Sequence, residues 1–146
     1  MFRTLVFAIL LAVPSLAKAD ALGLLFDGPY TVPVVPIDAN SFEAIEADGA
    51  GAKQMWCAAG IFANNVLGQG KAKLYIKQAR GSSVTVAGRK GVIFTTQPVP
   101  DATKSYSFSL RKVGLTFSVS TVYGLCEGDP FRRVRVILPD GRYVWY

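Results

Sequence analysis

The chain has 146 residues, with 16 basic and 10 acidic side chains and no histidine. A chain without histidine cannot build a Ser-His-Asp or Cys-His catalytic arrangement, and it offers no imidazole ligand for a metal. The excess of basic side chains is modest. It favours weak association with anionic surfaces but does not by itself indicate a nucleic-acid-binding protein.

Residues 1–19 have the three parts of a cleavable secretory signal. Arg3 makes the amino end positive, residues 5–13 form an apolar run, and residues 17–19 form an A-x-A cleavage site. The apolar run is far shorter than the roughly 20 residues that span a bilayer. A buried amino-terminal helix is the alternative interpretation. We expect export and cleavage, which would leave residues 20–146 as a single domain in the periplasm or outside the cell.

The first part of this domain, residues 20–40, is apolar and interrupted by Pro29, Pro33 and Pro36. Proline has no backbone N–H to donate, so it is poorly suited to the middle of a sheet. The pattern therefore predicts an extended arm or an edge strand rather than a central strand.

Residues 53–67 are predicted to form an amphipathic helix. From Met55 to Val66, apolar side chains recur at the i, i+3, i+4 and i+7 positions that share one face of a helix. Gly68 fits the position after the helix, where a left-handed backbone favours glycine. Gly60 in the middle costs about 1 kcal/mol relative to alanine, so it either permits close approach of a strand or is simply tolerated.

The rest of the chain reads as short strands separated by turn residues. Candidate strand segments cover residues 42–47, 71–78, 84–86, 92–96, 105–110, 113–120, 132–138 and 142–146; the first is weak, and 105–110 with 113–120 form a hairpin or one bent pair. The Asp-Gly dipeptide before the last of these favours a tight hairpin. One early helix followed by strands predicts an α+β fold, in which an antiparallel sheet of about six or seven short strands is covered by one helix.

The chain has two cysteines, Cys57 in the predicted helix and Cys126 near the carboxyl end. Two cysteines in an exported chain most simply form one disulfide. Closing a loop of about 70 residues would stabilise the fold by on the order of 4 kcal/mol through chain entropy. A reactive redox pair is the alternative, but there is no C-x-x-C spacing and no histidine to activate a thiolate. We predict a structural disulfide.

The sharpest candidate for a binding surface is a basic face around residues 71–80. Strand alternation would place Lys71, Lys73, Tyr75 and Lys77 on one face, and Arg80 in the next turn would extend it. Such a face could hold an anionic polymer, a lipid headgroup or an acidic protein. The alternative is a solvated face whose lysines discourage edge-to-edge aggregation.

A second candidate is the aromatic end of the chain. Tyr143, Trp145 and Tyr146 could form an exposed patch that stacks on sugars or partner proteins. Packing of Trp145 into the core is the interpretation that we favour for that residue.

Four segments carry a resemblance to known sequences: FEAIEADGAGA from Phe42, WCAAG from Trp56, LYIKQARG from Leu74 and GRKGVIFT ending at Thr95. They resemble a family of small exported alphaproteobacterial proteins without an established activity. The resemblance implies an exported domain with one disulfide, in which Cys126 is the partner of the cysteine in WCAAG. It implies nothing about chemistry.

We therefore expect a non-enzymatic periplasmic or secreted binding protein that holds an unidentified protein or an anionic envelope component through a sheet face. We predict no catalytic residue, metal ligand, cofactor or nucleic-acid partner, and contact with a membrane that is peripheral at most; the oligomeric state is left open. Two alternatives remain. The chain could be an inhibitor-type protein that inserts a rigid loop, such as residues 97–104, into another protein, or it could be a small hydrolase of unrecognised type.

Overall fold

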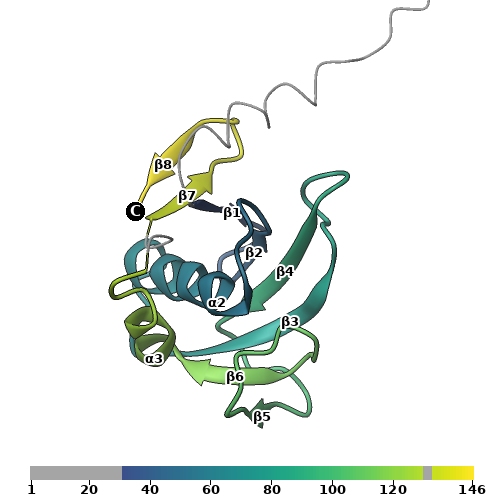
Figure 1. Ribbon diagram of the computed structural model, residues 1–146, viewed down its shortest axis with the longest axis vertical. Coiled ribbons are helices and arrows are strands. Elements are labelled where there is room, and N and C mark those ends of the chain that lie inside the picture. Colours follow the sequence, from purple (N-terminus) through teal and green to yellow (C-terminus); the bar gives the residue numbers. More distant parts are fainter. Residues whose placement is uncertain (1–30, 130–132) are drawn as a thin grey trace, which may run out of the picture.

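The computed structural model describes residues 31–129 and 133–146. The predicted signal and residues 20–30 of the predicted arm lie outside these ranges. The described chain is an α+β protein in which one mixed sheet of eight strands curls around a central helix (Figure 1). The predicted α+β class is confirmed, whereas the predicted sheet differs in strand number and is not purely antiparallel.

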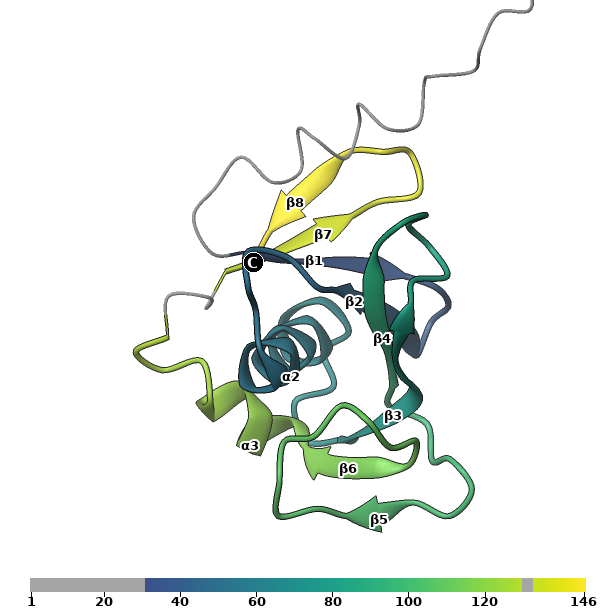
Figure 2. The same cartoon turned by 45° about the vertical axis from the view of Figure 1, so that its right-hand side comes forward.

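The two ends of the sheet lie far apart in space. Its strands run in the order β5-β6-β3-β4-β2-β1-β7-β8 (Figure 2). The β1–β7 and β5–β6 pairs are parallel and the other pairs are antiparallel. The elements are β1 (Thr31–Pro36), β2 (Ser41–Ile45), α2 (Ala52–Ile61), the π-helix η2 (Phe62–Val66), β3 (Lys73–Ser82), β4 (Lys90–Thr95), β5 (Thr103–Lys104), β6 (Leu115–Ser118), α3 (Val119–Gly124), β7 (Arg133–Ile137) and β8 (Tyr143–Trp145).

Strand β1 lies inside the sheet, so the expectation of an arm or edge strand is wrong for this segment. The strand changes partner along its length, which explains how it accommodates two prolines. Pro33 is paired with β7 alone, because pairing with β2 begins at Val34, and Pro36 is the last residue of the strand. Each proline therefore lies where fewer ladder hydrogen bonds are needed.

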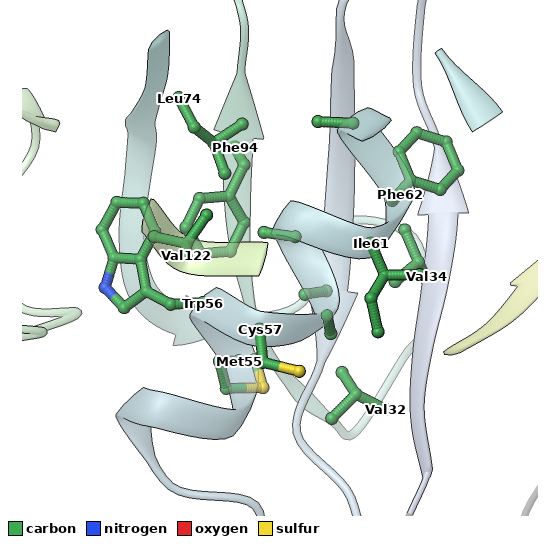
Figure 3. Packing of buried hydrophobic residues seen from close by; sticks show 14 of the residues in the cluster. Val32, Val34, Met55, Trp56, Cys57, Ile61, Phe62, Leu74, Phe94 and Val122 are labelled. Atoms are coloured by element: carbon green, nitrogen blue, oxygen red, sulfur yellow. The ribbon is translucent and has the colours of Figure 1, made fainter. Parts of the chain in front are cut away.

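The predicted helix is confirmed, and the structure divides it into α2 and η2. Trp56 packs edge-on against Phe94 of β4 with ring centroids 4.9 Å apart, and Phe62 packs against Phe42 of β2 at 4.3 Å. Figure 3 shows Trp56 projecting toward the strands of Leu74 and Phe94, on the opposite side of the helix from Ile61. Burial of these rings and the aliphatic residues around them provides the main favourable free energy of folding.

The predicted disulfide is also confirmed. Cys57 of α2 and Cys126, which follows α3, are bonded with their Cα atoms 5.2 Å apart. The bond links two helices that lie side by side on the open side of the curled sheet (Figure 1). It therefore connects the central helix to the carboxyl-terminal third of the chain.

Helix α3 begins at Val119 and so replaces the last two residues of the strand predicted over residues 113–120. Strand β6 ends at Ser118, whose side chain accepts a hydrogen bond from the backbone N–H of Thr121 and so caps the helix. Serine is one of the preferred residues at this position. Val119 and Val122 are then buried on one side of the short helix.

The strand predicted over residues 105–110 is absent from the described structure. The Oγ atom of Ser105 bonds the backbone of Ser107, and the Oγ atom of Ser109 accepts from the backbone of Arg111. Serine side chains that bond nearby backbone groups compete with strand pairing. The alternation of serine with apolar residues thus produces a chain of tight turns here.

Candidate functional site

The structure separates the basic face that was predicted around residues 71–80. Tyr75 is buried, and the register of β3 against β4 shifts twice between Ile76 and Gly81. These irregularities break the simple alternation on which the prediction depended. Lys71 precedes β3, while Lys73 and Lys77 are exposed on the strand itself.

Two of the predicted cations are engaged by acidic side chains. The Nζ atom of Lys77 lies 3.7 Å from a carboxylate oxygen of Asp38 and donates a hydrogen bond to the Oγ atom of Ser41. Arg80 forms a bidentate contact with Glu46, in which its Nε and Nη2 atoms each donate over 2.6 Å. Planar pairing of this kind is among the stronger side-chain contacts.

These contacts also set the protonation of the acids. The hydrogen bonds from Arg80 hold the pKa of Glu46 below its usual value, and the same contact raises the pKa of Arg80. The pKa of Asp38 is lowered by a hydrogen bond from the backbone of Asn40 and, less strongly, by the charge of Lys77. Both carboxylates are therefore ionised at neutral pH, and they compete with any ligand for the two cations.

Lys73 has a different environment, because it lines an open groove at the β5 end of the sheet. The groove has a volume of about 580 Å³ and also contains Lys104. Strand pairing brings the two together: Lys104 of β5 is opposite Thr116 of β6, and Lys73 of β3 is opposite Ser118 of β6. Neither lysine has an ion-pair or hydrogen-bond partner in the part of the chain that the structure describes.

One exposed aromatic side chain, that of Tyr106, lines this basic groove and is 96% exposed. Phe117 also contributes to the lining, but it is paired with the buried Leu74, and its ring packs against Trp56 and Phe108 with ring centroids 5.0 and 4.7 Å away. The Phe117 ring therefore faces the core, and Tyr106 is the ring that is free to contact a ligand.

Hydroxyl groups form much of the remaining lining. Ser118 and Thr121 are within 2.6 Å of each other through their hydroxyl oxygens, and Ser105 donates to the backbone of Ser107. Thr116 is more than nine-tenths buried, and its hydroxyl has no hydrogen-bond partner among the described residues. A buried hydroxyl without a partner costs about 1–3 kcal/mol.

The basic groove carries no carboxylate in its lining. Two cations, one exposed ring and several hydroxyls are suited to holding a polar anionic molecule by charge, stacking and hydrogen bonding. Sequence reasoning identified Lys73 but missed Lys104, Tyr106, Phe117 and Thr116. No local pattern indicates them, because β5 has only two residues and its pairing with β6 depends on a loop whose serines were interpreted as a strand.

The aromatic candidate lies at the other end of the sheet. Tyr143 and Trp145 share one face of β8 with ring centroids 6.0 Å apart, and Trp145 is 45% exposed, so its predicted burial is wrong. The guanidinium of Arg135, which is only 1% exposed, lies 4.9 Å from the Tyr143 ring and 4.5 Å from the Trp145 ring. The rings thus cover a buried cation.

One acidic side chain that sequence reasoning placed in a weak strand has a clear structural role. Glu43 of β2 is fully buried, and its carboxylate accepts hydrogen bonds from the backbone N–H groups of Val84 and Thr85 and from the hydroxyl of Ser83. It thereby holds the turn between β3 and β4 against the outer face of the sheet. Gly91 leaves room for the carboxylate, since a Cβ atom at that position would collide with it.

The loop that was considered as an inhibitory segment is exposed. Residues 97–102 lie almost entirely in solvent, and the backbone N–H of Thr103 donates to the carbonyl of Gly114, which fixes the end of the loop beside β6. Its insertion into another protein stays a prediction.

Comparison with protein-family models, with curated proteins and with solved structures finds no match to this chain. The site is therefore interpreted from its own geometry. Across residues 31–129 and 133–146, no helix has the length and apolar character needed to cross a membrane, and no group of three or more acidic or cysteine side chains is placed to hold a metal.

Proposed function

We propose that the protein is an exported, non-enzymatic binding protein that holds an anionic ligand in the basic groove. The observation that carries the proposal is that Lys73 and Lys104 line the same groove, which has no carboxylate in its lining. Lys77 and Arg80, by contrast, are bound to acids of the chain. A ligand with negative charge gains attraction there without displacing an internal ion pair.

Export is part of the same proposal. The disulfide is typical of proteins that fold in an oxidising compartment, and the signal predicted in residues 1–19 would direct the chain there. The envelope of a bacterium contains abundant anionic polymers and lipid headgroups, so an anionic ligand would be available to an exported protein.

A binding role is favoured over catalysis by the composition of the groove. Its polar groups are lysine ammonium and hydroxyl groups, and the described hydroxyls of Ser118 and Thr121 bond each other and the helix backbone. An efficient general base needs a pKa near the working pH and a position next to the reacting group. Of the acids in the described chain, Glu46 and Asp129 instead pair with cations and Glu43 supports a loop.

The test is a comparison of two double variants that remove the same charge. Lys73→Gln/Lys104→Gln removes both cations of the basic groove, and Lys90→Gln/Lys112→Gln removes two exposed lysines that do not line it. We expect the groove variant to bind a sulfated oligosaccharide of the heparin type about tenfold or more weakly than the unmodified protein, since even an ordinary hydrogen bond is worth about 0.5–1.5 kcal/mol and the variant loses two contacts.

The control variant should lose affinity only through the reduced net charge, which acts weakly at physiological salt. The affinity is measured by calorimetry at fixed ionic strength. An equal loss in both variants would show that binding follows total charge, and the proposal would then be abandoned.

A further inference from the structure

A second hollow lies beside the basic groove, on the other side of the first residues of β3. It has a volume of about 760 Å³, and its lining includes three residues with side-chain amides, Asn64, Gln69 and Gln97, together with Lys71 and several small residues. We call it the amide hollow. Lys71 and Ala72 line the amide hollow and Lys73 lines the basic groove, so the two surfaces adjoin at the start of β3.

Ala72, at this boundary, is held in place by a residue next to the basic groove. The carbonyl of Ala72 accepts a hydrogen bond from the backbone N–H of Val119, the residue after Ser118. The two surfaces thus meet at a fixed ridge, which is formed by the start of β3 and the junction of β6 with α3.

The amide hollow is shaped by the unusual end of the central helix. Asn64 belongs to the π-helix η2, and Gly70 lies so close to its amide that a Cβ atom there would collide with it. The Gln97 side chain makes no hydrogen bond within the described residues, while Gln69 donates to Asn40. π-Helical turns often occur at functional sites, because they reposition side chains that a regular helix would direct elsewhere.

The chemistry of the two surfaces together is specific. Amides and hydroxyls donate to and accept from neutral hydroxyl groups. The exposed Tyr106 ring can stack on the apolar C–H face of a pyranose, while Lys71, Lys73 and Lys104 attract carboxylate or sulfate groups.

We propose that the ligand is an acidic polysaccharide whose chain crosses the ridge at Ala72 and places sugar units in both the basic groove and the amide hollow. This inference rests on the proposed function and names the class of ligand. A ligand with several hydroxyl groups for each negative charge explains why amide side chains lie next to the lysines. A ligand that offers charge alone does not explain the amide hollow.

Two other anionic partners fit the surface less well. An acidic protein segment that adds to the sheet needs a long free edge, but β5 has only two residues. An anionic membrane would favour several exposed apolar side chains for insertion. Tyr106 is the one large exposed aromatic residue that lines the basic groove in the described structure.

The experiment measures the affinity of the oxidised protein for four probes: an oligogalacturonate hexasaccharide, the corresponding disaccharide, the carboxyl-reduced hexasaccharide and poly-L-glutamate of similar charge. Phosphatidylglycerol vesicles serve as a fifth probe. We expect the hexasaccharide to bind at least about tenfold more tightly than each of the others, since only it combines charge, hydroxyl groups and the length to reach both surfaces.

Two variants separate the surfaces. Asn64→Ala/Gln97→Ala should remove the advantage of the hexasaccharide over the disaccharide and leave disaccharide binding unchanged, whereas Lys73→Gln/Lys104→Gln should weaken both. The inference is overturned if poly-L-glutamate or the vesicles bind as tightly as the hexasaccharide, if the disaccharide or the reduced hexasaccharide binds equally well, or if the hexasaccharide does not bind.

These outcomes are distinct from failure of the proposed function. Should the Lys73→Gln/Lys104→Gln variant weaken binding of poly-L-glutamate or vesicles, the anionic groove stands and only the polysaccharide is excluded. Should no anionic probe respond to that variant more than to Lys90→Gln/Lys112→Gln, both proposals are excluded.

Discussion

The contact between Arg80 and Glu46 binds a guanidinium that would otherwise be available to an anionic ligand. The pair lies in a partly exposed position, with 40% of the arginine side chain and 27% of the glutamate side chain accessible. Solvent therefore screens the attraction, and a stabilisation of about 0.5–1 kcal/mol is expected for a well-aligned pair of this kind. At the scale of single residues, the distribution of acids decides which cations remain free.

The pH dependence of stability tests this pair. Folding lowers the pKa of Glu46 from its usual 4.5, so its contribution is fully present above that pH and is lost as the pH falls through the lowered pKa. We expect Glu46→Gln to reduce the free energy of unfolding by about 0.5–1 kcal/mol at neutral pH, and the difference from the unmodified protein to vanish in acid. Urea unfolding between neutral pH and about pH 3 measures both.

Glu127→Gln is the matched control, because the described side chain of Glu127 is exposed and forms no ion pair. Its difference from the unmodified protein should be small at every pH. A Glu46→Gln curve that stays parallel to the unmodified protein down to acid pH would contradict the assigned role of Arg80.

Among the elements, the contact between α2 and α3 depends on a glycine. A Cβ atom at Gly60 would lie 2.8 Å from the backbone nitrogen of Tyr123 and 2.9 Å from Cγ2 of Val122. The glycine therefore permits close approach, as one of its two sequence interpretations proposed, but the approaching element is a helix and not a strand. The disulfide joins α2 to the residues that directly follow α3, and so holds the same two helices together.

Alanine at Gly60 should consequently destabilise the protein. Its better helix propensity, worth about 1 kcal/mol, is opposed by a collision with backbone that cannot move aside easily, and overpacking of this kind costs about 1–3 kcal/mol. We expect a net loss of up to about 2 kcal/mol in the free energy of unfolding, measured by urea denaturation of the oxidised protein.

Gly124→Ala provides the comparison within the same helix pair, since nothing lies within 4 Å of a Cβ atom at Gly124. That variant should be neutral or slightly stabilising. If Gly60→Ala were as stable as Gly124→Ala, the two helices would not be as closely packed as the structure indicates.

The elements that the sequence predicts well are those specified by local spacing. The helix over residues 53–67 follows from a strong apolar period, and the final hairpin follows from Asp140-Gly141. The serines between residues 105 and 109 have the strand period but use their side chains in turns, so the same rule fails there. Ser118 with Thr121 was a usable capping signal for α3 that the alternation of neighbouring residues concealed.

At the scale of the whole molecule, the site depends on pairings that no local pattern contains. The basic groove exists because β6 lies between β5 and β3, which brings Lys73 beside a two-residue strand about 30 positions away in the sequence. Likewise β1 enters the interior of the sheet only because β7, from the far end of the chain, pairs with it in parallel. Residue types therefore predicted a basic site, but not which cations would form it.

The curled sheet also separates the two surfaces that were candidates for function. The basic groove lies at the β5 end, and the exposed Tyr143 and Trp145 lie at the β8 end (Figure 1). The core around α2 and the Cys57–Cys126 disulfide lie between these two ends of the sheet and form a fixed frame. A ligand bound at one end should therefore leave the other end unchanged.

Backbone amide spectra recorded during titration with an anionic oligosaccharide test the central claim most directly. With a sulfated oligosaccharide of the heparin type, we expect shift changes to concentrate at residues 73–74, 103–106 and 116–121, which include all the residues that line the basic groove, and to be absent at 143–146. Changes centred on residues 143–146, or spread evenly over all exposed lysines and arginines, would contradict the assignment of the basic groove as the binding site.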